Sequence, residues 1–563
     1  MTTTHAAADG DETKCPCCDN PWSRGTADMF SQLCAMCDEK KTAVEEEKEE
    51  PLVVPGLDPS NMDPSVRPSD NFYMYSNGGW VQNNPIPPGY PSWNSFLMLH
   101  VQSQERLKAM LQDLETKKAK GETALSADEA KVARFYAAAM DEAAIEVAGT
   151  APLRPLLDLC AAAADATCTA SAGGAGGDAL LATSVGRLVA QCGMSAFFAI
   201  GASPDNKNSD HSLCQVYQGG LGLPDRDYYF DDDKEDKRVA YKTHVALMLT
   251  LLDDPKATEP TAESTEAAES VYNLEMKLAE AHMTKTENRD PNATYNPMTV
   301  AELTERCGSA FDFASYFAAA AKSAEELGRI NVRNTKAIAK VAEVVSTVEK
   351  DVMHQYLRWH AVNKFAAYLS TPFVNADFNF FEKELAGTAE IKPRWKRAMA
   401  FTDSALGEVQ GKLYCAKHFD ESSKGHALKI VENVRQALED RLKEVDWMTS
   451  DATREEALKK MSRFRVKIGY PDKWIDYSSL KIEEGDSFLE MVFKAKVFDH
   501  MRDVKEMNAP TDRDKWFMYP HVINAYYHPS LNEIVFPAAI LQPPFFNANA
   551  DDAVNYGAIG AGE

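Results

Sequence analysis

Residues 524–546 read NAYYHPSLNEIVFPAAILQPPFF. The first four residues carry two bulky aromatic side chains, which suit a pleated surface. Residues 528–532 have turn composition, and residues 533–536 form a second short apolar run that Pro537 ends. The sequence therefore predicts a β-hairpin whose outer strand offers unpaired backbone groups to an extended peptide. An ordinary hairpin without a ligand is the alternative.

The same stretch resembles a hallmark of the neprilysin and endothelin-converting-enzyme family of zinc metallopeptidases. In that family an Asn-Ala pair grips the substrate backbone, so the resemblance implies this role for Asn524 and Ala525. Other segments match the family in the same order, from about Leu57 to the last residue: Asn77-Gly78-Gly79-Trp80, Gly219-Gly220-Leu221-Gly222-Leu223-Pro224, Pro393-Arg394-Trp395-Lys396 and Ile468-Gly469-Tyr470-Pro471. The resemblance implies a zinc metalloendopeptidase that hydrolyses peptide bonds of oligopeptides.

Stripes of apolar residues at helical spacing, together with this resemblance, give a mainly α fold. We expect a large helical domain over residues 57–503. The incomplete start of an α+β zinc-peptidase catalytic domain, which carries the hairpin, follows over residues 504–563. Ahead of both, residues 1–14 are predicted to be a disordered tail and residues 38–56 an acidic linker.

Three local patterns predict particular elements. Ser126 and Glu129 form a capping-box pattern, which marks the start of a helix. Residues 197–200 and 212–217 alternate around a polar segment and predict a second hairpin. Residues 160–178 are rich in Ala and Gly, and we interpret them as a loop insertion.

Five of the eleven cysteines lie within the first 37 residues. Cys15 and Cys18 form one Cys-x-x-Cys pair, and Cys34 and Cys37 form a second. Four thiolates at this spacing can surround a zinc ion tetrahedrally and leave no open position for catalysis. We therefore predict a structural zinc module at residues 15–37, with a disordered, thiol-rich tail as the alternative.

The catalytic machinery of such peptidases is a His-Glu-x-x-His helix, whose histidines bind zinc and whose glutamate is the general base. None of the twelve histidines in this chain is followed or preceded by Glu. The lead that precedes this helix in the family is present at residues 555–560, and Ala561-Gly562-Glu563 follows. Cys415 and His418 lie close in sequence, but a cysteine protease also needs an orienting third group.

We therefore assign no catalytic residue and expect catalytic zinc only in a full-length relative. The chain is interpreted as a truncated family member that is inactive by itself. The alternative is a non-catalytic protein that binds peptides or partners and carries an N-terminal zinc module.

The composition limits which partners and which cellular compartment are expected. The chain has 563 residues, 44% of them apolar, and a formal net charge of −25. Nucleic acid and acidic membranes need a basic face, so neither is expected as a partner. We see no signal peptide and no run of about 20 apolar residues that could span a membrane. The cysteines beyond residue 37 are scattered, and secreted members of the resembled family carry disulfide cysteines where this chain has Ser69, Asn77, Ala139 and Ala398. The resemblance therefore favours a reducing compartment, and we predict cytoplasmic localisation.

The apolar run at residues 540–546 packs into a catalytic domain in intact relatives. Because a partial domain cannot bury its faces, we expect this run to be exposed here. The partners expected are therefore a peptide substrate or ligand and a chaperone or complementing C-terminal fragment.

Overall fold

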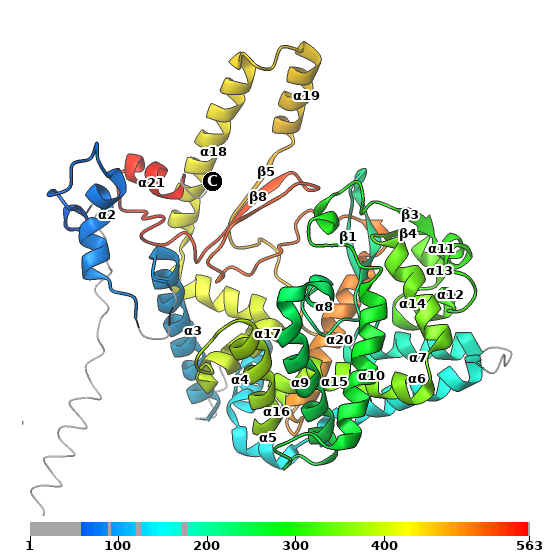
Figure 1. Cartoon of the computed structure of the whole chain (residues 1–563). Coiled ribbons are helices and arrows are strands. Elements are labelled where there is room, and N and C mark those ends of the chain that lie inside the picture. The colour runs from blue at the N-terminus through cyan, green and yellow to red at the C-terminus, as the bar shows by residue number, and fades with distance from the viewer. Residues whose placement is uncertain (1–57, 88–89, 91, 120–124, 172–176, 561–563) are drawn as a thin grey trace, which may run out of the picture. The chain divides into compact units, whose positions relative to one another are not determined.

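The computed structural model describes residues 58–87, 90, 92–119, 125–171 and 177–560. The predicted tail, zinc module and linker lie outside the described residues, and so do Cys15, Cys18, Cys34, Cys37 and Glu563. Helices dominate the described part, with two small sheets among them (Figure 1). The predicted mainly α fold is confirmed.

The first described helices are α2 (Phe72–Asn83), α3 (Ser95–Ala119), α4 (Ala127–Met140), α5 (Glu142–Ala148), α6 (Arg154–Ser171) and α7 (Gly177–Cys192). α4 begins at the predicted capping box, in which the Glu129 carboxylate accepts the Ser126 N–H at 2.8 Å. The loop predicted at residues 160–178 is wrong over 160–171, which continue α6. Alanine is the best helix former, and Cys160 and Ala163 are fully buried in the contact of α6 with α7 and α15.

A five-stranded sheet follows, with the order β1-β2-β4-β3 and with β6 also paired to β2. Its strands are β1 (Phe198–Asp205), β2 (Asn208–Gln218), β3 (Pro297–Thr299), β4 (Arg329–Val332) and β6 (Ala509–Pro510). β1 and β2 form the predicted second hairpin, with Phe198 opposite Gln218. The N–H of Ala202 on β1 donates to the Asp503 carboxylate at 2.9 Å, so a side chain of α20 caps this edge.

The middle of the chain supplies α8 (Asp227–Phe230), α9 (Glu235–Asp253), α10 (Ala262–Ala279), α11 (Val300–Cys307), α12 (Phe313–Ala320), α13 (Ala324–Leu327), α14 (Thr335–Thr347), α15 (Lys350–Phe365), α16 (Thr371–Asp377) and the π-helical η6 (Phe378–Leu385). Short 3₁₀ turns are η1 (Pro59–Asn61), η2 (Ala151–Leu153), η3 (Asp232–Lys234), η4 (Glu287–Arg289) and η5 (Ala366–Tyr368).

The later helices are α17 (Arg394–His418), α18 (Glu421–Glu444), α19 (Asp451–Ser462), α20 (Phe488–Glu506) and α21 (Asp552–Ile559). α18 and α19 pack against each other as a helical hairpin, drawn in yellow and gold in Figure 1. Arg454 on α19 closes this hairpin by donating to the carbonyls of Leu442 at 2.8 Å and Met448 at 2.7 Å. The first bond satisfies a carbonyl at the end of α18 that has no partner within its own helix, and the second holds the connection between the two helices.

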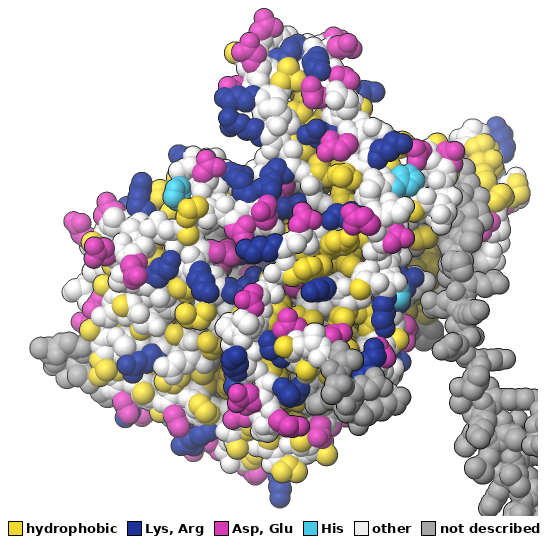
Figure 2. Space-filling view, turned by 180° about the vertical axis from the view of Figure 1, so that it is seen from behind, with side chains coloured by type: hydrophobic (Ala, Val, Ile, Leu, Met, Phe, Trp, Pro, Cys, Tyr) yellow, Lys and Arg dark blue, Asp and Glu magenta, His cyan; other side chains and the backbone are white. Residues whose placement is uncertain are grey.

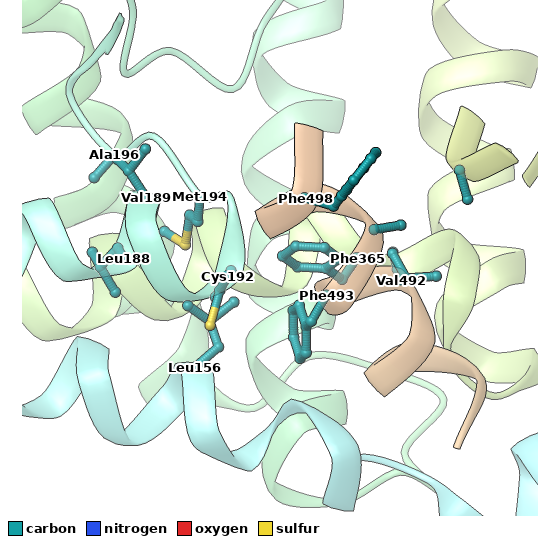
Figure 3. Packing of buried hydrophobic residues seen from close by; sticks show 14 of the residues in the cluster. Leu156, Leu188, Val189, Cys192, Met194, Ala196, Phe365, Val492, Phe493 and Phe498 are labelled. Carbon is teal, nitrogen blue, oxygen red and sulfur yellow. The ribbon is translucent and has the colours of Figure 1, made fainter. Parts of the chain in front are cut away.

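The hydrophobic core joins helices that are distant in sequence. Figure 3 shows Leu156 of α6 and Cys192 of α7 near the side chains of α20. Phe365 of α15 meets Phe493 of α20 edge to face, with ring centroids 4.8 Å apart. This arrangement is favourable for two aromatic rings.

A buried carboxylate organises the polar part of the core. Glu275 on α10 is completely buried and accepts hydrogen bonds from Tyr229 (2.8 Å), Tyr241 (2.6 Å) and Trp359 (3.2 Å). The ring nitrogen Nε2 of His360 lies 2.9 Å from Oε1 of Glu275. A buried charge needs such a full set of partners, so this network ties α8, α9, α10 and α15 together.

The apolar run at residues 540–546 is packed rather than exposed. Ile540, Leu541 and Phe546 are 4%, 2% and 2% exposed, so the expectation of an open patch at these side chains is wrong. The segment packs into the core that the described residues themselves supply. Figure 2 shows acidic and basic side chains interspersed over one face of the molecule. None of the described helices has both the length and the apolar character that crossing a membrane requires.

Candidate functional site

The predicted hairpin lies in a three-stranded sheet with the strand order β5-β8-β7. Its strands are β5 (Arg465–Gly469), β7 (Tyr526–His528) and β8 (Glu533–Pro537). β7 runs antiparallel to β8, with Tyr526 opposite Val535, and β5 runs parallel to β8. The hairpin is therefore present as predicted. Within the described chain, β7 has β8 on one side and no strand on the other.

Asn524 and Ala525 lie directly before this edge strand. Asn524 is exposed, while Ala525 is half-buried and packs against the hydrophobic core. The Asn524 side-chain oxygen accepts the N–H of Ala525 at 2.9 Å, which leaves the amide nitrogen as the donor of this side chain. Both residues directly precede the open edge of β7. Their role in holding a substrate stays a prediction.

The turn of the hairpin is fixed to its surroundings. Asn532 has a φ of 50°, in the left-handed region that asparagine tolerates better than most residues. Its carbonyl accepts the N–H of Arg465 at 2.9 Å, and its side chain donates to the Lys460 carbonyl at 2.8 Å. The turn is thereby attached to both β5 and α19.

A buried ion pair joins two strands of the sheet. The Glu533 side chain on β8 is 0% exposed and the Lys467 side chain on β5 is 9% exposed, with Nζ 2.8 Å from Oε2 and 2.9 Å from Oε1. Lys467 also donates to the Lys515 carbonyl at 2.8 Å. Desolvated charges are tolerated only with such close partners, so this pair fixes β5 against β8 and the loop of Lys515 over both.

Aromatic rings border β7 on both faces. Phe517 stacks on His528 with centroids 4.9 Å apart, and its N–H donates to the Tyr526 hydroxyl at 3.0 Å. On the other face Tyr527 stacks on Phe464 at 6.1 Å. Burial raises the pKa of Tyr526 to about 12. Burial also lowers the pKa of His528, so its ring is neutral at neutral pH.

The segment that leads into β7 is anchored on α17. The Tyr519 ring lies against Gly407, where an added Cβ would come 2.2 Å from a ring carbon. His521, only 5% exposed, places Nε2 at 2.5 Å from the Asp403 carboxylate. His521 is therefore a packing residue that positions the edge strand.

The family-like lead at residues 555–560 is itself helical and belongs mostly to α21. α21 docks on α18 through two polar contacts: His426 with Asp552 at 2.6 Å, and Asn433 with the Tyr556 hydroxyl at 2.6 Å. These contacts place α21 beside the base of the α18–α19 hairpin, as Figure 1 shows.

The described residues do not fit a catalytic zinc ion. In the described part of the chain, no three side chains of His, Cys, Asp or Glu converge as a metal site. Burial raises the thiol pKa of Cys415 to about 12 and leaves the residue 7% exposed, which disfavours a nucleophilic thiolate.

Sequence reasoning did not single out Lys467, Glu533 or Phe517. A signal for the first two was present, because each charge stands within or beside an apolar strand: Val466-Lys467-Ile468 and Glu533-Ile534-Val535. Lys and Glu side chains are almost never fully buried unless they are paired, so burial of one would point to the other as its partner. Phe517 lies in a loop, and no sequence pattern connects it to β7.

Comparison with known proteins places the chain in a family. The sequence profiles of peptidase family M13 match residues 68–471 and residues 524–562. Endothelin-converting enzyme 1 of Bos taurus is 29% identical over 510 residues, which are 89% of this chain and 65% of that protein. Membrane metallo-endopeptidase-like 1 of Mus musculus is 29% identical over 519 residues, 89% of this chain and 66% of that protein. The chain thus spans less than two thirds of the length of these relatives.

Among solved structures, the zinc metalloprotease Zmp1 of Mycobacterium tuberculosis in complex with an inhibitor is similar, with a TM-score of 0.79 and 33% sequence identity. The match covers 90% of this chain and 73% of Zmp1. The resemblance to the neprilysin and endothelin-converting-enzyme family is thereby confirmed. Because the family profile covers more than half of its residues, this chain belongs to peptidase family M13.

Proposed function

We propose that this chain binds extended oligopeptides as an added strand along the free edge of β7, as the peptide-holding part of a zinc metalloendopeptidase. The observation that carries the proposal is the position of β7 as the last strand of its sheet, directly after Asn524 and Ala525. An edge strand presents N–H and C=O groups that pair with a peptide backbone of almost any sequence. Such pairing suits a peptidase that acts on oligopeptides.

We further propose that these 563 residues bind peptides without cleaving them. None of the twelve histidines stands next to a glutamate, and the described residues bring no three metal ligands together. The zinc chemistry of the family therefore has no ligand set among the described residues. The non-catalytic alternative, a peptide-binding protein with an N-terminal zinc module, rests on the same observation.

Edge binding is tested with a fluorescein-labelled, Ala-rich octapeptide and the full 563-residue chain, with fluorescence anisotropy as the readout. The same peptide methylated on alternate backbone nitrogens cannot complete the ladder, so we expect it not to bind. Asn524→Ala removes one donor and should weaken binding by roughly two- to tenfold. Asn375→Ala, at an exposed asparagine of α16, is the matched control and should bind like the unaltered chain. Equal binding of the methylated and parent peptides would reject edge pairing.

Cleavage is tested on the same peptide with and without a chelator, followed by mass spectrometry. We expect the peptide to stay intact in both samples. Chelator-sensitive cleavage by the 563-residue chain would reject binding without hydrolysis.

For the N-terminal cysteines we propose a structural zinc ion bound by Cys15, Cys18, Cys34 and Cys37. The support is their paired Cys-x-x-Cys spacing. Metal analysis of the purified chain should give one zinc ion per chain, and the double variant Cys15→Ser/Cys34→Ser should lose it. Zinc that persists in the double variant would place the metal elsewhere.

We propose a cytoplasmic, reducing environment for the chain. Five cysteines in the described part are free thiols: Cys160, Cys192, Cys214, Cys307 and Cys415. Free thiols are usual where glutathione keeps cysteines reduced. Titration of the unfolded, metal-free chain without reductant should yield all eleven thiols.

As further partners we propose a chaperone or a complementing C-terminal fragment that carries a His-Glu-x-x-His helix. The support is a pair of apolar side chains on α18: Val434 is 37% exposed and Leu438 is 48% exposed. Both follow Asn433, which contacts Tyr556 of α21. A hydrophobic dye should bind this face, and the fragment should displace the dye. A chain that binds neither would contradict the proposal.

A further inference from the structure

A peptide paired with β7 would present its side chains to two different surfaces. Successive residues of a strand point to opposite faces of the sheet, and an added strand follows the same alternation. On β7 itself, Tyr526 and His528 share one face and Tyr527 occupies the other. The chemistry of these two faces therefore decides which adjacent side chains a bound peptide can carry.

The first face is aromatic. Phe517 is 45% exposed, although its ring is held by stacking on His528 at 4.9 Å and by an edge contact with Tyr526 at 6.1 Å. The hydrogen bond from its N–H to the Tyr526 hydroxyl fixes the backbone of the loop. A ring that is ordered yet half open offers a ready partner for another aromatic side chain.

The first face also carries little net charge. Lys515 lies over the Phe517 ring with Nζ 5.5 Å from the centroid, but Glu506 pairs with it at 2.6 Å. His528 is neutral at pH 7, because burial lowers its pKa. Neither an acidic nor a basic side chain would find an unpaired partner here.

The second face carries a cation without an acidic partner. Tyr527 is 43% exposed, and Lys460 of α19 lies over it with Nζ 5.8 Å from the ring centroid. The neighbouring Lys459 pairs with Glu456 at 3.1 Å, whereas Lys460 forms no ion pair with any described residue. In a chain with a net charge of −25, this face is a local exception that favours an acidic side chain.

We propose that the β7 edge selects peptides in which an aromatic residue stands next to an acidic one. The aromatic side chain would lie against Phe517 and His528, and the acidic side chain would lie beside Tyr527 and Lys460. This selectivity rests on the proposed edge binding, and it adds a substrate class to that function.

The test uses the full 563-residue chain and Ala-rich octapeptides with a central guest pair, measured by fluorescence anisotropy at low salt. Phe-Glu should bind tighter than Ala-Glu by roughly two- to twelvefold, the range expected for an aromatic pair. Phe-Glu should also bind tighter than Phe-Lys by about threefold, a difference that salt removes.

Variants assign each preference to its face. Phe517→Ala should abolish the preference for Phe over Ala, and Phe517→Tyr should keep it. Lys460→Glu should reverse the preference for Glu over Lys, while Lys459→Glu, with the same change in net charge, should leave it unchanged. Trp447→Ala, at a 74% exposed ring in the α18–α19 connection, is the control for loss of an exposed aromatic side chain.

The outcomes separate the two proposals. Tight binding of every guest pair alike, or equal effects of Phe517→Ala and Trp447→Ala, would overturn the selectivity while leaving edge binding intact. Absence of binding by every peptide, or equal binding of backbone-methylated peptides, would overturn edge binding and the selectivity with it.

Discussion

Removal of one partner of the Lys467–Glu533 pair should loosen the sheet that carries β7. Lys467→Met leaves a carboxylate that is 0% exposed without its cation, and Glu533→Leu leaves a 9% exposed ammonium without its anion. Solvent cannot screen either charge at this depth. Breaking a buried pair from one side costs about 3–5 kcal/mol.

The double variant Lys467→Met/Glu533→Leu removes both charges and fills the space with apolar atoms. Its cost should be close to zero, because the desolvation penalty of both ions disappears together with their attraction. The exposed pair between Arg465 of β5 and Asp514 of the loop between β6 and β7 is the matched control, with side chains 36% and 79% exposed and 2.8 Å between the charged atoms. Asp514→Asn should cost at most about 1 kcal/mol.

Hydrogen exchange followed by mass spectrometry measures the local stability of these strands. It does not require the assumption that so large a chain unfolds in two states. Peptides that cover β5 and β8 should exchange faster by roughly two to three and a half orders of magnitude in each single variant. The double variant should recover most of the protection. Unchanged exchange in both single variants, or a double variant worse than either, would refute the view that this pair fixes the sheet.

Gly222→Ala should destabilise the chain by about 3 kcal/mol or more in thermal unfolding, because the added Cβ would lie 2.0 Å from the Tyr241 hydroxyl. Gly425→Ala on α18 is the control: its Cβ would have no atom within 4 Å, so this change should be neutral or stabilising. His244 is buried, and burial lowers its pKa from 6.5 to about 3. The unfolded chain therefore binds the proton of this histidine more tightly than the folded chain does. As the pH falls from 6.5 towards 3, the free energy of unfolding should decrease by up to about 1.4 kcal/mol per pH unit. A stability profile for His244→Phe that parallels that of the unaltered chain would contradict this. Cys415 should stay unmodified by iodoacetamide at pH 8 in the folded chain and react after denaturation, since burial holds its thiol protonated.

Local patterns in the sequence were sufficient for the elements that depend on near neighbours. The hairpin at β7 and β8 follows from a turn flanked by two short β-prone runs, and the start of α4 follows from the reciprocal Ser126–Glu129 bonds. The position of Asn524 and Ala525 directly before β7 follows from the same local order. In each case the interacting groups are a few residues apart, so the chain itself brings them together.

Contacts between distant segments were decided by the tertiary structure. Residues 160–171 looked like a low-complexity loop, yet they continue α6, and its contacts with α7 and α15 bury Cys160, Ala163 and Ala164. The partner of β8 is β5, more than sixty residues earlier, and this parallel register brings Lys467 to Glu533 and the loop of Phe517 to His528. Parallel pairing and loop packing depend on the free energy of burying a shared core, and that free energy belongs to the assembled fold and not to any one stretch of sequence.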